Sequence, residues 1–283
     1  MPPSKVGPPL SPAHTMSVLF HIPFAFSVAV MLPVAMLTAY TIVIKPFELI
    51  KMLLENYTTT LMPALSAASV QTTKEENAEA IYKMGRYSNL MSAPLALGAA
   101  MLCEPFIRVW VGEEYVQYAW IAQMASLFQL FWQMNNVIFA ASFGLGRAKR
   151  LTILAWISAL TNVSMTIYLI PKMGIAGAVL ATMVTGSMTI PLHHLLIFPR
   201  IGIKPLRFLK ESVLRGQYPT WLAALVLIPA LDPIQRCDTW LELIAAAGLI
   251  ALVFGAVIWK LGLDKSHRDL ITSKLKRKLG KAS

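Results

Sequence analysis

The sequence predicts an all-α, polytopic membrane protein with about eight transmembrane helices. Eight apolar stretches cross the 283-residue chain, and most of them are about 20 residues or longer, as a helix crossing about 30 Å of hydrocarbon requires. Twenty of the 25 lysines and arginines lie on alternate connections or in the terminal segments, against three on the opposite connections. The chain is also 56% hydrophobic and only 14% charged, whereas a soluble domain carries about 25% charged residues.

Apolar length defines each expected helix in turn. The stretches cover residues 16–36, 38–70, 88–110, 116–144, 150–170, 173–198, 217–231 and 239–260. We expect a disordered cytoplasmic segment at 1–15, a transmembrane helical domain at 16–263 and a basic cytoplasmic tail at 264–283. The polar connection 71–87 predicts an amphipathic helix on the membrane surface, with its acids near its start. The connection 199–216 predicts a basic amphipathic segment that leads into the seventh span.

The distribution of cations also predicts orientation. By the positive-inside rule, both termini lie in the cytoplasm, as an even number of crossings requires. We therefore expect a multi-pass protein of the bacterial inner membrane. The net charge of +11 belongs to the cytoplasmic loops and the tail, where it fits topology and anionic headgroups of membrane lipids, so we expect no nucleic-acid partner.

The sequence shows no catalytic or cofactor-binding pattern. It lacks Gly-x-Ser-x-Gly, His-Glu-x-x-His, a phosphate-binding P-loop and an Asp-rich metal motif. Cys103 and Cys237 have no metal or redox spacing, and we interpret them as free thiols. We therefore expect no enzyme, no cofactor and no metal, and the composition favours a transporter or channel.

A series of short motifs resembles one family of transporters. The order and spacing of these motifs resemble polysaccharide flippases of the O-antigen and teichoic-acid type, in the superfamily that also holds multidrug exporters. They are Ala39-Tyr40, Leu61 to Ser66, Tyr87 to Pro94, Glu104 to Tyr115, Gly144 to Arg150, Asn162 and Leu169 to Thr182.

The resemblance implies export of a lipid-linked oligosaccharide of the undecaprenyl pyrophosphate type by alternating access. It covers the second lobe of such a transporter with two extra helices. We therefore expect the first lobe to be absent or supplied by a separate chain, and a polysaccharide polymerase is a further possible partner. Two alternatives stay open. One is a multidrug or small-solute exporter of the same superfamily, and the other is a truncated, non-transporting fragment or assembly partner.

Four ionisable residues on the second stretch are the first candidates for a substrate site. Lys45, Glu48, Lys51 and Glu55 fall within one arc of about 120° on a helix. Their spacings permit i,i+3 and i,i+4 ion pairs, and charges inside a membrane are costly unless they line water or pair with one another. We interpret this face as the lining of a central cavity that attracts pyrophosphate. A self-neutralised stripe covered by another lobe is the alternative.

Two further features complete the expected site. Gln129, Gln133 and Asn136 recur at helical spacing within the fourth stretch, which predicts either a sugar-facing strip or hydrogen bonding between helices. Pro63 removes a backbone hydrogen bond near the end of a long helix, so it is either a hinge for lobe movement or a helix end at the membrane surface.

Overall fold

The computed structural model describes residues 26–69, 73–144, 149–265, 268–269 and 272–273, and its described side chains exclude those of residues 57–69, 135 and 144. All regular structure in these residues is helical, so the all-α expectation is confirmed for this part of the chain. A helical turn over residues 26–31 precedes the first long helix. The expected segment 1–15 and most of the tail 264–283 lie outside the described residues.

The helices follow the order of the expected apolar stretches. The long helices are α2 (Val34–Ser69), α3 (Lys74–Val111), α4 (Ala119–Gly144), α5 (Lys149–Met173), α6 (Ile175–Leu196), α8 (Arg215–Leu227) and α10 (Trp240–Val257). Shorter elements join them: η1 (Glu113–Tyr118), η2 (Phe198–Arg200), α7 (Pro205–Phe208), η3 (Leu209–Leu214), η4 (Ile228–Ala230), α9 (Leu231–Gln235) and, after α10, η5 (Ile258–Gly262).

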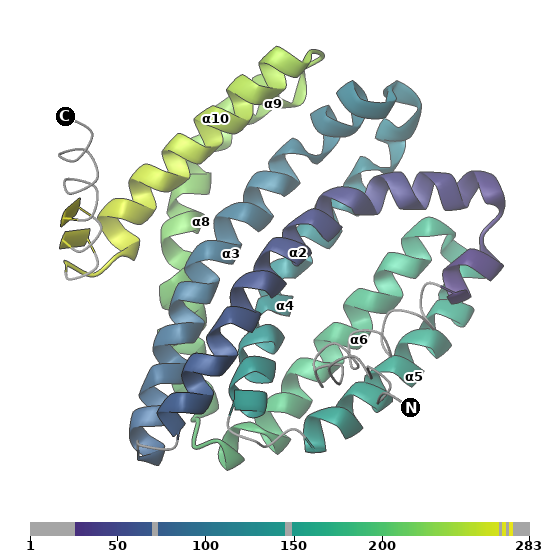
Figure 1. Ribbon diagram of the computed structural model, residues 1–283. Coiled ribbons are helices and arrows are strands. Elements are labelled where there is room, and N and C mark those ends of the chain that lie inside the picture. Colours follow the sequence, from purple (N-terminus) through teal and green to yellow (C-terminus); the bar gives the residue numbers. More distant parts are fainter. Residues whose placement is uncertain (1–25, 70–72, 145–148, 266–267, 270–271, 274–283) are drawn as a thin grey trace, which may run out of the picture.

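Four of the described helices are long and apolar enough to cross a membrane. They are α3, α5, α6 together with η2, and α10 together with η5. These helices indicate a membrane protein, and the expected total of about eight spans stays a prediction. The starts of α3 and α5 and the end of α6, where many of the basic residues lie, share one end of the molecule (Figure 1).

The expectation of a separate surface helix at 71–87 is wrong. It forms the first turns of α3, which continues unbroken for 38 residues. Thr73 starts the helix through a capping box: its hydroxyl accepts a hydrogen bond from the Glu76 amide at 3.3 Å, and the Glu76 carboxylate accepts one from the Thr73 amide at 2.8 Å. No proline follows before Pro94, so nothing ends the helix at the expected boundary.

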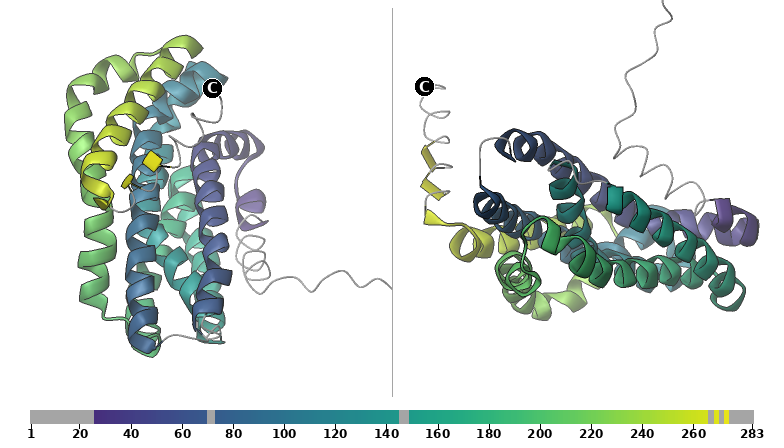
Figure 2. Two further views of the ribbon diagram at one scale, coloured as in Figure 1. Left: turned by 60° about the vertical axis from the view of Figure 1, so that its left-hand side comes forward. Right: turned by 90° about the horizontal axis from the view of Figure 1, so that it is seen from below.

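The helices form three adjoining groups. Helices α8 and α10 pack on one side of α3, α4 packs against α3 and α2, and the α5–α6 hairpin lies on the other side of α4 (Figures 1 and 2). The hairpin turns at Gly174, whose φ of 56° lies in the region that glycine adopts without steric cost. Pro171 belongs to the last turn of α5, just before this hairpin turn.

Candidate functional site

The four charged residues of α2 form two ion pairs along the helix. Lys45 Nζ lies 2.6 Å from Glu48 Oε2, and Lys51 Nζ lies 3.7 Å from Glu55 Oε1. These are the i,i+3 and i,i+4 pairs that the spacing predicts. The side chains differ in exposure, because Lys51 is 14% exposed whereas Lys45 and Glu48 are about half exposed. Lys51 is therefore the charged group of this face that the fold encloses.

A pocket of about 750 Å³, which includes its open mouth, lies between α2, α4, α5 and α6. Its lining is largely aromatic and apolar, as is typical of ligand pockets in proteins. The aromatic rings are those of Tyr40, Phe47, Phe128 and Trp132. The polar lining side chains are Glu48, Lys51, Asn162 and Thr182.

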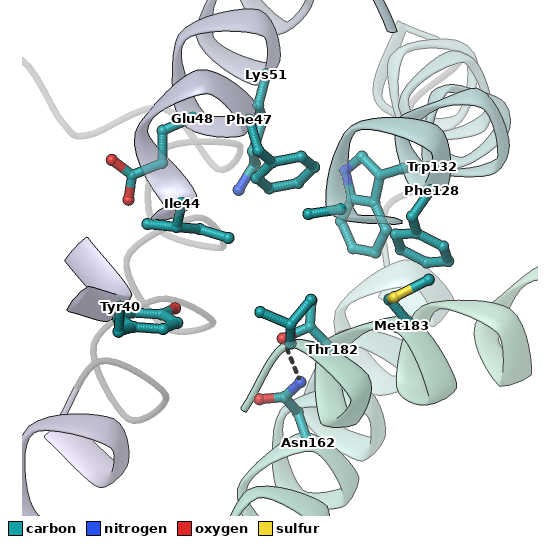
Figure 3. A pocket seen from close by; sticks show the side chains of 12 residues that line it. Tyr40, Ile44, Phe47, Glu48, Lys51, Phe128, Trp132, Asn162, Thr182 and Met183 are labelled. Atoms are coloured by element: carbon teal, nitrogen blue, oxygen red, sulfur yellow. Dashed lines mark hydrogen bonds between the residues drawn. The ribbon is translucent and has the colours of Figure 1, made fainter. Parts of the chain in front are cut away.

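Figure 3 shows how the charged and aromatic groups are arranged in the pocket. The Lys51 amino group comes down beside the Phe47 ring, on the α2 side of the pocket. Phe128 and Trp132 form the wall opposite, and they pack against each other with ring centroids 6.2 Å apart. The Glu48 carboxylate points away from these two rings. The pocket thus carries one ammonium group on its α2 side and a wall of two aromatic rings on the opposite side.

Asn162 is a pocket residue that the sequence analysis did not single out as a site. Its side-chain amide nitrogen donates to Thr182 Oγ1 at 3.4 Å. Its other polar atom, Oδ1, has no hydrogen-bond partner among the described residues, although the side chain is only 1% exposed. A buried acceptor without a partner is energetically unfavourable, and a ligand hydroxyl in the pocket would relieve this cost. The only sequence signal was the place of Asn162 in the motif series.

The amides of α4 lie elsewhere. Gln129, Gln133 and Asn136 are not among the residues that line the pocket. The Gln133 amide donates to the Ser88 hydroxyl of α3, and the Asn136 amide donates to Gln133 Oε1 at 3.2 Å. Gln129 is fully buried, and its amide has no hydrogen-bond partner among the described residues. Hydrogen bonding between helices, one of the two expectations, is the arrangement seen for Gln133.

A polar layer joins α3, α4 and α8, and we define it by the side chains of Ser88, Asn89, Gln133, Asn136 and Gln217. Gln217 Nε2 donates to Asn89 Oδ1 at 2.9 Å and to the Leu130 carbonyl at 3.1 Å, so one side chain of α8 joins α3 and α4. Asn89 in turn donates to the Gly85 carbonyl at 2.8 Å. This layer could not be predicted from the sequence, because Asn89 and Gln217 lie in separate stretches without a shared pattern.

The structure also bears on the expected roles of Pro63 and of metal ions. Helix α2 continues past Pro63 to Ser69, so the proline lies near the end of a long helix, as expected, without ending it at residue 63. The Pro63 side chain lies outside the described ones, and the hinge stays a prediction. The described residues contain no cluster of His, Cys, Asp and Glu that could hold a metal ion.

Comparison with known proteins supports a coarse assignment. No family model matches the sequence, and no solved structure matches it. Over 102 residues the chain is 31% identical to an uncharacterized membrane protein of Methanocaldococcus jannaschii, a match that covers 36% of this chain and 20% of the relative. The match thus spans about a fifth of the relative's length. Together with the four long apolar helices, this similarity indicates a membrane protein.

Proposed function

We propose that this protein translocates a lipid-linked oligosaccharide across the bacterial inner membrane, with both termini in the cytoplasm. The observation that carries the proposal is the combination of groups in one pocket. These are the Lys51 ammonium, the aromatic wall of Phe128 and Trp132, and Asn162 Oδ1, which has no hydrogen-bond partner within the described part of the chain. Each of these groups matches one part of such a substrate.

The ammonium group matches the phosphates. Lys51 is largely enclosed, and its carboxylate partner Glu55 stands at 3.7 Å, longer than a direct charge-assisted hydrogen bond. A pyrophosphate that enters the pocket therefore competes with Glu55 for Lys51 and gains a closer contact. Lys45 already holds Glu48 at 2.6 Å and does not line the pocket, so it is less available.

The remaining lining matches a sugar. Asn162 Oδ1 accepts a hydrogen bond from a sugar hydroxyl, and this interaction satisfies its buried lone pairs. The rings of Phe128 and Trp132 offer flat apolar surfaces to the apolar faces of sugar rings. The basic residues at one end of the helix bundle support a cytoplasmic location for that end.

One observation favours a second candidate function, export of a small solute such as an organic cation by the same pocket. Four of the lining residues are aromatic, and the charged ones are a single lysine and a single glutamate. An aromatic pocket with a carboxylate suits an organic cation, whereas a cavity made for pyrophosphate would be expected to carry more cations.

Transport by the purified full chain in liposomes tests both candidates. The first probe is a fluorescent undecaprenyl pyrophosphate-linked oligosaccharide, and the second is ethidium, an aromatic organic cation. Lys51→Gln removes a charge-assisted contact worth about 1.5–3 kcal/mol, so we expect it to weaken binding of the lipid-linked probe about tenfold or more. Lys45→Gln is the matched control and should leave binding within about twofold.

Glu55→Gln should change the affinity for the lipid-linked probe in the opposite direction. It removes the carboxylate that competes for Lys51, so binding of the lipid-linked probe should tighten a few-fold. Equal binding in the Lys51→Gln, Lys45→Gln and unmodified proteins would remove the phosphate role of Lys51. Transport of ethidium without flipping of the lipid-linked probe would favour the second candidate, and transport of neither probe would contradict both.

A further inference from the structure

Gly186 of α6 packs against the two rings that form the aromatic wall of the pocket. A β-carbon at this position would be 2.5 Å from Phe128 Cζ, 3.0 Å from Phe128 Cε1 and 3.1 Å from Trp132 Cζ3. The first separation is far below the 3.5–4.0 Å optimum for two carbon atoms. The present position of both rings therefore depends on the absence of a side chain at residue 186.

The atoms that Gly186 accommodates are the far ends of side chains, not backbone. At Gly177, on the same helix, a β-carbon would instead meet the backbone of Leu169 and Ile170 in α5. Backbone can move only if a whole helix moves, whereas a phenyl or indole ring can turn about its side-chain torsions. Substitution at Gly186 should thus move the rings while the helices stay in place.

Both rings line the pocket, so their position determines its shape. We propose that Gly186 sets the position of the Phe128–Trp132 wall and, through it, the width of the pocket. The inference deepens the proposed function and rests on it in one respect: the group that the wall accommodates is taken to be a sugar ring of the substrate. The position of the wall itself is measurable without any ligand.

Fluorine NMR of the full chain labelled with 5-fluorotryptophan tests the position of the wall. Trp132→Phe identifies the Trp132 resonance among those of the seven tryptophans. Gly186→Ala is expected to shift this resonance. Gly248→Ala is the matched control, because a β-carbon at Gly248 of α10 would meet no atom of another described helix within 4 Å, and it should leave the Trp132 resonance unchanged.

A second variant distinguishes a displaced wall from a misfolded protein. Phe128→Leu shortens the side chain that Gly186 accommodates, so the double variant Gly186→Ala/Phe128→Leu should return the Trp132 resonance towards that of Phe128→Leu alone. An unchanged Trp132 resonance in Gly186→Ala would overturn the inference, as would a shift that Phe128→Leu does not relieve.

Binding then tests the width of the pocket with two probes that differ by the presence of a sugar. Undecaprenyl pyrophosphate carries the phosphates alone, and the second probe adds a disaccharide. Gly186→Ala should weaken binding of the disaccharide probe at least tenfold more than that of the sugar-free lipid, whereas equal losses would overturn the claim about width. If the unmodified protein binds neither probe, the proposed function fails, and the NMR result alone decides whether Gly186 positions the wall.

Discussion

Arg86, near the start of α3, donates two hydrogen bonds of 3.1 Å to the carboxylate of Asp264, just beyond η5. The same guanidinium donates to the Gly262 carbonyl at 2.9 Å, and the Tyr87 hydroxyl donates to Asp264 at 3.1 Å. One end of the α10–η5 helix is thereby fastened to α3. The Arg86 side chain is 12% exposed and that of Asp264 is 47% exposed, so one partner is enclosed and the other faces the surroundings.

Removal of this charge should destabilise the protein modestly. Asp264→Asn keeps the shape of the side chain but weakens the contacts with Arg86, and because Asp264 is half exposed we expect a loss below about 1 kcal/mol. Thermal unfolding in detergent measures the effect. Asp232→Asn is the control, since the Asp232–Arg236 pair is more than 70% exposed on both sides. Equal melting temperatures for the two variants would show that the Arg86–Asp264 contact adds no stability.

The same contact predicts a dependence on pH. Burial alone would raise the pKa of the Asp264 carboxyl, but the charge of Arg86, hydrogen bonds from Arg86 and Tyr87 and the charge of Arg215 outweigh it and lower the pKa below its usual value of 3.8. A lowered pKa in the folded state adds stability that is fully present above the usual value and is lost as the pH falls through the folded-state value.

The difference in melting temperature between the unmodified protein and Asp264→Asn should therefore stay constant from about pH 7 to about pH 5. It should shrink as the pH falls below 3.8, the usual pKa. Melting curves of both proteins at matched pH values measure this difference. A difference that grows on acidification would contradict the prediction.

The polar layer between α3, α4 and α8 should contribute to stability. Gln217→Leu removes the donor to Asn89 Oδ1 and to the Leu130 carbonyl, and hydrogen bonds between helices in membranes are worth about 1 kcal/mol. We expect a loss of about that size, measured by unfolding in mixed detergent micelles. In a double-mutant cycle with Asn89→Leu, the second substitution should cost less than the first. Strict additivity would show that the two side chains act independently.

Two glycines should respond to alanine with opposite signs. Gly177→Ala places a β-carbon against the backbone of Leu169 and 3.0 Å from the Ile170 nitrogen, so α5 and α6 must separate, at a cost of about 1–3 kcal/mol. At Gly255 of α10 a β-carbon meets nothing within 4 Å, and alanine should stabilise the helix by about 0.5–1 kcal/mol. Melting temperatures that change in the same direction for both variants would contradict this account.

Local features of the site were predictable from the sequence. The pairs Lys45–Glu48 and Lys51–Glu55 follow from helical spacing alone, since residues three or four apart meet on any α-helix. The approximate places of the helices follow from apolar length. Helix boundaries were harder, because the capping box at Thr73 starts α3 well before the apolar part of that helix begins.

Relations between helices were not predictable in the same way. The amides of α4 mark one face of that helix, but α4 is apolar around most of its circumference, so nothing in its sequence decides whether that face meets α3 or the pocket. Asn162 and Thr182 meet across the α5–α6 hairpin, and Arg86 meets Asp264 from the far end of the chain. Such contacts depend on how whole helices pack, which a single sequence does not specify.

The bonds of Arg86 and Arg108 in α3 limit how the C-terminal helices can move. Arg108, near the other end of this helix, donates to Glu104 and Glu113 at 2.9 Å and to the Gln235 carbonyl just before α10. Helix α3 is thus bonded at two points to the C-terminal helices: Arg86 binds the end of the α10–η5 helix, and Arg108 binds the last residue of α9. A slip of the α10–η5 helix by one helical turn, about 5.4 Å, would break the bonds of Arg86 to Gly262 and Asp264. These bonds involve no residue that lines the pocket, so a displacement of α2 or of the α5–α6 hairpin would change the pocket and leave them intact.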